Sequence, residues 1–404
     1  MSDLSLHLDE LSLDGGATVL LRHALLPLHP GDRLAIHGSA PSLELHLRAW
    51  ARAEGHEFES AEDDGAANAP ASHRGTLVRG TAINARWAHA QLAGHPGHDG
   101  AMDHASPTWG LAARGATVEA GAPAFAFALA DKDEVWCDNA GQLYRAAAAA
   151  QWDPATAIPW DAPRTHPPFV EDALLQVLTY LIENETAALL VPARFCATVH
   201  PHFREVVQLL AIQAADEARH IEVFTHRALL ARDRLGLSTG GGQASLQTLV
   251  EEPDFALASF LLSVLGEGSF LNLLGFLQTH APDRCTAEIM RLAAIDEARH
   301  VAFGMSHLLR HAEHDSSLRT RLRSAIERRH DMLQHTAGLN AEVFDSLVVL
   351  AAGALDPRAI ARGHEAVADL QTQMDSGRRA RLRRLGFDEF EAKQLSSLHT
   401  RNFM

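Results

Sequence analysis

The pentapeptide Asp-Glu-Ala-Arg-His occurs twice in this chain, at Asp216–His220 and again at Asp296–His300. Residues three positions apart lie on one face of a helix, so each copy presents a carboxylate and an imidazole toward the same point. Carboxylates and imidazoles are ligands for divalent transition metals. Two such helices that face each other can therefore hold two metal ions between them.

The residues around the two copies argue against a solvated helix face. Ala214, Ala215 and Ile221 flank the first copy, and Ile295 and Val301 flank the second. Burial of Asp, Glu, Arg and His together costs several kcal/mol unless a cation or full pairing compensates. A metal-free scaffold with a buried ion-pair network is therefore the least favoured interpretation.

A two-metal site in a helical bundle needs one more carboxylate from each of two other helices. These carboxylates are expected about one helical hairpin before each Glu-x-x-His. The stretch Phe255–Leu277 is almost wholly apolar and contains a single acid, Glu267. A lone acid in the middle of a buried helix needs a cation, so Glu267 is the candidate for the second half.

The first half offers two candidates, Glu183 and Glu185, before the first pentapeptide. We prefer Glu185 because its separation from Glu217 is closer to the separation between Glu267 and Glu297. Glu183 remains the alternative.

Over roughly residues 165–312 the chain resembles the ferritin-like di-iron carboxylate superfamily. That superfamily includes bacterial multicomponent monooxygenases, the ribonucleotide reductase small subunit and arylamine N-oxygenases. The resemblance implies a mainly α fold, a ferritin-like four-helix bundle, with Glu217 and Glu297 as bridging or near-bridging ligands. It assigns the catalytic and metal-binding roles to six residues: Glu185, Glu217, His220, Glu267, Glu297 and His300.

The resemblance also implies contacts around the ligands. In monooxygenases of this type, the acid before the motif Glu hydrogen-bonds the histidine of the opposite repeat. Asp216 would then orient His300, and Asp296 would orient His220. The arginines of the two pentapeptides would neutralise these aspartates: Arg219 and Arg299.

Three positions depart from the patterns of individual subfamilies. Phe224 stands where the reductase subunit has its radical tyrosine, so a stored tyrosyl radical is not expected. Ala293 replaces the third histidine of the arylamine N-oxygenases, and Leu271 replaces a threonine of the multicomponent monooxygenases. The subfamily therefore stays open.

The helix after Glu267 is apolar on the face that it shares with that acid, which favours an organic substrate over iron storage. Ordinary core packing is the alternative reading of these side chains. The residues expected to line a substrate pocket are Tyr180, Phe224, Phe270, Leu271 and Leu274.

Three glycines interrupt this helix, Gly266, Gly268 and Gly275. Each costs about 1 kcal/mol relative to alanine in a helix interior. They predict a π-bulge, close helix packing or room for a substrate.

The function expected from these residues is that of a non-haem di-iron monooxygenase. It would activate O2 at two Fe ions and oxygenate a small organic substrate, by hydroxylation or N-oxygenation. A Mn/Fe pair is also compatible, because oxygen-rich sites discriminate weakly between these metals. A di-iron oxidase or desaturase and a ferroxidase or iron-binding protein remain alternatives.

Electrons for such a reaction must come from outside the chain. No Gly-rich dinucleotide or flavin motif is present, and Cys137, Cys196 and Cys285 are isolated, so no iron–sulfur cluster is expected. An external reductase or ferredoxin is the expected partner. A basic cluster, Arg378–Arg384, is a candidate docking surface for an acidic one.

Composition limits the remaining partners and the location. The 404 residues carry a formal charge of −16, which argues against general nucleic-acid binding. No apolar stretch of membrane-spanning length lacks a charge, and the N-terminus does not resemble a signal peptide. We expect a cytoplasmic protein without membrane contact, and a homodimer.

Composition shifts predict four parts: 1–80, 81–160, 161–315 and 316–404. The first is a small α+β domain, with strands expected at Leu4–Leu8 and Arg33–His37 and helices around Thr18–Leu26 and Ser42–Glu54. Residues 81–160 are a linker and connecting region, with strands expected in 109–137. Residues 161–315 are the bundle, and 316–404 form extra C-terminal helices.

Residues 1–80 also resemble the TusA-like sulfur-carrier family, through Leu28–Ile36 and Trp50–Phe58. That family bears Cys-Pro-x-Pro at the start of its first helix, where this chain has Asp14–Thr18. Without a thiolate, persulfide transfer is impossible at this position. We expect a degenerate module that serves packing, dimerisation or partner contact.

Overall fold

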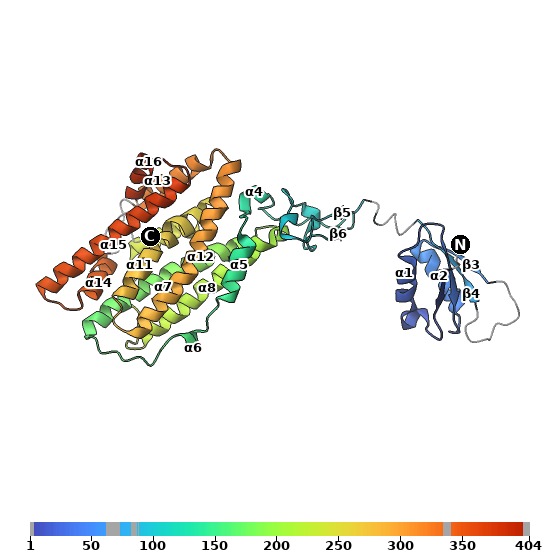
Figure 1. Ribbon diagram of the computed structural model, residues 1–404, viewed down its shortest axis with the longest axis horizontal. Coiled ribbons are helices and arrows are strands. Elements are labelled where there is room, and N and C mark those ends of the chain that lie inside the picture. The colour runs from blue at the N-terminus through green and yellow to red at the C-terminus, as the bar shows by residue number, and fades with distance from the viewer. Residues whose placement is uncertain (1–3, 62–72, 82–86, 88, 334–340, 399–404) are drawn as a thin grey trace. The chain divides into compact units, whose positions relative to one another are not determined.

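The computed structural model describes residues 4–61, 73–81, 87, 89–333 and 341–398 (Figure 1). The chain divides into two compact units. One comprises Met1–Ala93 and Ala116–Pro123, and the other comprises Gly94–Gly115 and Ala124–Met404. The finer division into four parts remains a prediction.

The first unit is built on a four-stranded mixed sheet of order β1-β2-β4-β3. β1 is parallel to β2, while β4 is antiparallel to both of its neighbours. Its elements are β1 (Leu4–His7), α1 (Thr18–Leu25), β2 (Arg33–His37), α2 (Leu43–Glu54), β3 (Glu57–Ser60) and β4 (His73–Val78).

The core of this unit follows from the alternation of side chains along the strands. Leu34 and Ile36 of β2 are buried, as are Leu21 of α1 and Leu47 of α2. The expected small α+β domain is confirmed. Its likeness to TusA-like carriers remains a prediction.

The expectation of strands in 109–137 is wrong for the described structure. This range contains only the two-residue β6 (Thr117–Val118), paired with β5 (Gln91–Leu92), and isolated bridge residues. Gly110, Gly115 and Gly121 take positive φ values, which interrupt an extended chain. Three short helices complete the connection: α4 (Lys132–Val135), α5 (Ala140–Ala149) and α6 (Pro154–Ala157).

Four long helical segments form the expected bundle in the second unit, so the mainly α fold is confirmed. α7 packs against α8, and the third segment packs against the fourth. The segments are α7 (Pro168–Cys196), α8 (Arg204–Leu229), the continuous run α10 (Phe255–Ser259), η5 (Phe260–Glu267) and α11 (Gly268–Thr279), and α12 (Arg284–His314).

The third segment is not a regular α-helix. Its middle part, η5, is π-helical and ends at Glu267. The π-bulge that the glycines predict is therefore present, directly before Gly268.

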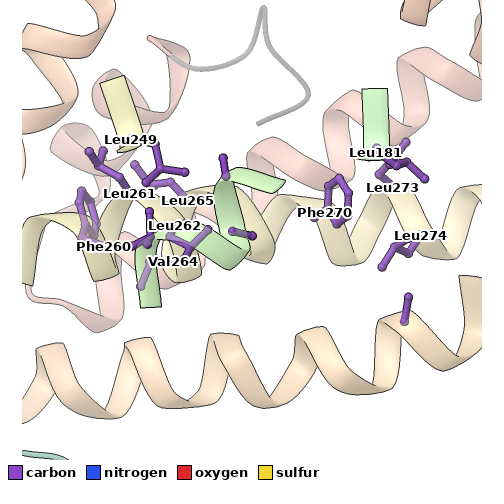
Figure 2. Close-up of a cluster of buried hydrophobic side chains, with 14 of the residues drawn as sticks. Leu181, Leu249, Phe260, Leu261, Leu262, Val264, Leu265, Phe270, Leu273 and Leu274 are labelled. Carbon is purple, nitrogen blue, oxygen red and sulfur yellow. The ribbon is translucent and has the colours of Figure 1, made fainter. Parts of the chain in front are cut away.

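The bundle core is apolar along this segment. Figure 2 shows Leu261, Leu262 and Leu265 of η5 together with Leu249 of α9 (Gly240–Val250). By length and composition, Pro168–Cys196 and Phe255–Thr279 could each cross a membrane, but most of each lies buried in the protein. A core helix of a bundle has this same composition.

Four further helices follow the bundle, as expected from the sequence. They are α13 (Leu318–Leu333), α14 (Ala341–Ala352), α15 (Pro357–Arg384) and α16 (Glu389–Ser397). The basic cluster Arg378–Arg384 forms the end of α15. Arg378 is buried and Arg381 is half-buried, whereas Arg383 and Arg384 are exposed, so only the end of this cluster lies at the surface.

Candidate metal centre

The structure brings the six predicted ligands together in the middle of the bundle. They form two overlapping groups of four, in each of which the candidate ligand atoms lie within 4.8 Å of one another. None of the six side chains is more than 4% exposed. The groups are Glu185, Glu217, His220 and Glu297, and Glu217, Glu267, Glu297 and His300.

Each helix of the bundle contributes to the cluster. α7 provides Glu185, and the π-helical segment ends on Glu267. α8 and α12 each provide one Glu and one His from their pentapeptides. Glu183, the alternative to Glu185, is half-exposed and belongs to neither group.

Glu217 and Glu297 are shared by both groups, which is the arrangement that bridging ligands require. The Nδ1 atom of His300 lies 3.0 Å from Glu217 Oε1 and 3.3 Å from Glu297 Oε2. The Nδ1 atom of His220 lies 3.2 Å from Glu217 Oε2 and 3.5 Å from Glu297 Oε1. Both imidazoles therefore turn Nδ1 toward the two shared carboxylates.

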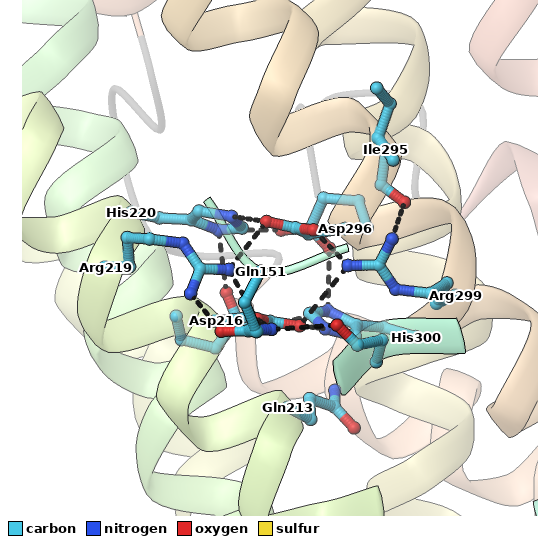
Figure 3. A network of polar contacts seen from close by, with 12 residues as sticks. Gln151, Gln213, Asp216, Arg219, His220, Ile295, Asp296, Arg299 and His300 are labelled. Atoms are coloured by element: carbon cyan, nitrogen blue, oxygen red, sulfur yellow. Dashed lines mark hydrogen bonds and ion pairs between the residues drawn. The ribbon is translucent and has the colours of Figure 1, made fainter. Parts of the chain in front are cut away.

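The other ring nitrogen of each histidine faces the aspartate of the opposite pentapeptide (Figure 3). His220 Nε2 lies 3.2 Å from Asp296 Oδ2, and His300 Nε2 lies 3.3 Å from Asp216 Oδ2. These are the crossed contacts that the resemblance implies. An Nε2–H that donates to the aspartate leaves Nδ1 as the metal-binding atom.

The two arginines of the pentapeptides bind the same aspartates. Arg219 Nη2 donates to Asp216 at 2.5 Å and to Asp296 at 2.9 Å. Arg299 Nη2 donates to Asp296 and lies 3.7 Å from Asp216. The aspartates are thus neutralised outside the cluster, as expected.

Three polar residues of this network are not found by reasoning from the sequence. Gln151 Nε2 donates to Asp216 at 2.8 Å, and Trp152 Nε1 donates to Asp296 at 2.8 Å. Gln213 Nε2 donates to Glu267 at 2.9 Å. Gln213 lies one helical turn before Glu217 in α8, and this spacing is the one signal in the sequence that could have identified it.

The electrostatics of the cluster call for cations. Burial, followed by repulsion from Glu217 and Glu297, raises the pKa of Glu185 well above its ordinary value. Burial and repulsion from Glu297 raise the pKa of Glu267 in the same way. Burial alone would lower the pKa of His300, but the surrounding carboxylates, Glu217 first, raise it well above its usual range.

The unsatisfied atoms of the cluster show that two divalent metals fit it. Buried oxygens of all four glutamates and Nδ1 of His300 have no hydrogen-bond partner among the described residues. Four ionised glutamates balance the charge of two divalent cations, because Arg219 and Arg299 already neutralise the aspartates. This buried carboxylate–imidazole cluster therefore fits a dimetal site.

The predicted pocket residues are packed in the core. Phe270 and Leu274 are buried, and Figure 2 shows them beside Leu273 and Leu181. Phe224 lies 6.2 Å from the His220 ring, between ring centroids. Tyr180 is buried and Leu271 is half-buried. That these five residues line a substrate pocket remains a prediction.

A small cavity lies next to a residue that contacts the cluster, and none of the six candidate ligands lines it. It is lined by Gln213, which contacts Glu267, and by Ser259, Ser263, Phe255 and Phe303 among others. Its volume is only about 10 Å³, which is roughly the space for one water molecule.

No family model and no curated protein matches the chain. Solved structures do match it. A mutant R2-like ligand-binding oxidase with an aerobically reconstituted Mn/Fe cofactor is 17% identical, with a TM-score of 0.49 over 61% of this chain and 92% of that chain. The metal-free R2-like ligand-binding oxidase is 16% identical (TM-score 0.44; 61% and 96%). The R2-like ligand-binding oxidase from Sulfolobus acidocaldarius is 18% identical (TM-score 0.41; 62% and 93%).

Proposed function

We propose that this chain is an O2-dependent oxidoreductase that holds two metal ions in the cluster. The observation that carries the proposal is the pair of overlapping groups whose buried oxygens lack partners. Two Fe ions are the expected loading. The Mn/Fe pair named for the R2-like ligand-binding oxidases is the alternative, since an oxygen-rich site accepts both metals.

The finer part of the proposal is oxygenation of a small organic substrate, by hydroxylation or N-oxygenation. When bound, two redox-active metals supply electrons and Lewis acidity to O2. The chain contributes the rest: Glu217 and Glu297 span both positions, and the aspartates fix the imidazoles. The apolar core around η5 excludes bulk water, which strengthens every electrostatic interaction inside.

The partners belong to the same proposal. An external reductase or ferredoxin would supply electrons to a homodimer in the cytoplasm. The exposed end of the basic cluster, Arg383 and Arg384, is the part of α15 that an acidic donor can reach.

Oxygen uptake tests the proposed function. The protein is loaded anaerobically with Fe(II), mixed with O2, and followed by O2 consumption and visible absorption. The wild type is compared with His300→Ala, and with His226→Ala as a control, because His226 is an exposed histidine on α8. We expect wild type and control to consume O2 at least about tenfold faster than His300→Ala, which loses a ligand. Equal rates in all three would overturn the proposal.

A ferroxidase is the second candidate, favoured by the small volume of the cavity beside Gln213, the residue that donates to Glu267. In that case Fe(II) is itself the substrate, and the same assay separates the two functions. A ferroxidase oxidises added Fe(II) repeatedly without an external reductant. An oxygenase stops after one turnover until electrons are supplied.

A further inference from the structure

Arg381 of α15 contacts the bundle segment that carries Glu267. Its Nε donates a hydrogen bond of 2.7 Å to the backbone carbonyl of Val264, which lies within η5. Val264 precedes Glu267 by three residues. A side chain from the C-terminal extension thus holds the backbone of the π turn that ends on a candidate metal ligand.

The carbonyl that Arg381 binds lies in a π-helical segment. In an α-helix, the amide four residues ahead occupies each carbonyl, and in a π turn this pattern shifts by one residue. The carbonyls at such a shift lose their regular partners and need another donor. The guanidinium of Arg381 brings a side-chain donor to this segment, at the Val264 carbonyl.

Gly268 makes the approach of Arg381 possible. A Cβ atom at this position would lie 2.5 Å from both Cζ and Nε of Arg381, closer than real contacts allow. Gly275, in the same helix, has no atom within 4 Å of the corresponding point. Position 268, directly after Glu267, therefore needs glycine for this contact, whereas position 275 does not.

Arg381 makes this contact without an acidic partner. Among the described residues, no carboxylate lies within 4.0 Å of its guanidinium, and its buried Nη2 has no hydrogen-bond partner. Burial, with a smaller effect from Arg378, lowers the pKa of Arg381 to about 10. The Val264 carbonyl is thus the one hydrogen-bond acceptor that the described structure gives to this cation.

We propose that Arg381 is a positioning residue for one of the two metal positions. By holding the Val264 carbonyl, it fixes the π turn and so the place of the Glu267 carboxylate. Glu267 belongs to the group with His300 and is absent from the group with His220. Loss of the Arg381 contact should therefore weaken one metal position and spare the other. This inference rests on the proposed two-metal function.

Mn²⁺ binding tests the inference without any activity assay. The full chain is titrated anaerobically with Mn²⁺ alone, and free and bound ion are counted by electron paramagnetic resonance. Arg381→Met removes the donor but keeps the length of the side chain. Gly268→Ala pushes the guanidinium away. Gly275→Ala is the matched control, and Arg381→Lys tests rescue by a conservative change.

We expect the wild type and Gly275→Ala to bind two ions per chain. Arg381→Met and Gly268→Ala should keep one tight ion and bind the second at least about tenfold more weakly. Because Arg381→Met and Gly268→Ala remove the same contact, the variant that combines them should bind the second ion no more weakly than Arg381→Met does. Arg381→Lys should recover part of the affinity for the second ion.

Two outcomes overturn the inference alone. The first is that Arg381→Met binds two ions per chain with the same affinities as the wild type. The other is loss of both ions in parallel with a lowered melting temperature, because that marks a general structural role. A wild type that binds no Mn²⁺, Fe²⁺ or mixture of the two contradicts the proposed function as well.

Discussion

At the scale of single residues, the crossed Asp–His pairs decide which nitrogen faces the metals. Asp296 of α12 holds Nε2 of His220 on α8, and Asp216 of α8 holds Nε2 of His300 on α12. Each pentapeptide therefore orients the histidine of the other. This reciprocity explains why Asp, Glu, Arg and His recur together as a unit.

Replacement of Asp296 by Asn tests this orientation. Asn presents an amide in place of the carboxylate, so the hydrogen bond to Nε2 of His220 weakens and the imidazole is free to turn. We expect a loss of metal affinity of about 10- to 100-fold, as for other residues that orient metal ligands. Anaerobic metal titration measures it, with Glu313→Gln as the control because Glu313 is exposed on the same helix. Unchanged affinity in Asp296→Asn would contradict the assigned role.

That the candidate ligands come together could be predicted from the sequence because Glu-x-x-His spacing depends only on helix geometry. Glu267 stood out as the one acid in an apolar stretch. Gln151 and Trp152 could not be predicted, since they belong to no motif and their contacts depend on how the chain packs. Gln213 was missed, although it lies one helical turn before Glu217.

At the scale of the helices, a buried ion network joins three members of the bundle. Arg227 of α8 donates to Glu171 of α7 at 2.7 and 3.1 Å, and to Asp283 at the start of α12 at 2.6 Å. His166 lies 2.5 Å from Glu171. Glu171 lies near the start of α7, Arg227 near the end of α8 and Asp283 directly before α12, so the network ties together these ends of three helices that carry candidate ligands.

The pH dependence of stability should report this network. Burial opposes ionisation of Glu171, but hydrogen bonds from Arg227 and His166 outweigh it and hold the pKa of Glu171 below its ordinary value. A carboxyl whose pKa is lowered by folding stabilises the protein above its unfolded pKa and loses this contribution as the pH falls through its folded pKa.

Glu171→Gln should therefore lose about 3–5 kcal/mol of unfolding free energy at pH 7, because Arg227 keeps a buried charge without its main partner. The difference from the wild type should shrink below about pH 4, where the unfolded carboxyl is protonated. Urea unfolding at pH 7, 5 and 3.5 measures this. Asp172→Asn serves as the control, because Asp172 is the next residue in the chain and its side chain is exposed. A difference that stays constant with pH would refute the assignment.

The helices of the bundle and the strands β1 and β2 of the first unit could be predicted because their apolar residues follow the helical and strand periods. The strands β3 and β4 were not predicted. The strands expected in 109–137 were wrong, since positive φ at Gly110, Gly115 and Gly121 interrupts that region. The π turn was one of three features that Gly266, Gly268 and Gly275 predicted. The contact of Arg381 with Val264 could not be predicted, because it joins segments far apart in the chain.

At the scale of the whole molecule, the two units have separate hydrophobic cores, and all six candidate ligands belong to the second. A chain that begins at residue 81 should therefore bind the same number of metal ions as the full chain. Metal analysis of the two purified chains measures this, with circular dichroism to verify the helix content. Loss of metal from a folded, shortened chain would show that the first unit supports the centre.

Metal loading should also stabilise the second unit. Without cations, the four buried glutamates repel one another, as the raised pKa values of Glu185 and Glu267 show. A ligand present at 100 times its Kd and bound only by the folded state adds about 2.7 kcal/mol of stability. We expect chelator to lower the melting temperature of the wild type by several degrees and that of His300→Ala by less, because the group without His300 can still hold one ion. Equal melting with and without chelator in the wild type would contradict this.

Anaerobic Fe(II) binding to the wild type and to Glu267→Leu is the most direct test of the two-metal centre. Two Fe(II) per chain in the wild type and one in the variant are the predicted result, since Glu267 serves only one of the two groups. No specific uptake by the wild type, together with a higher melting temperature in Glu267→Leu, would contradict it. That result would identify the cluster as a buried ion-pair network that apolar residues replace with a gain in stability.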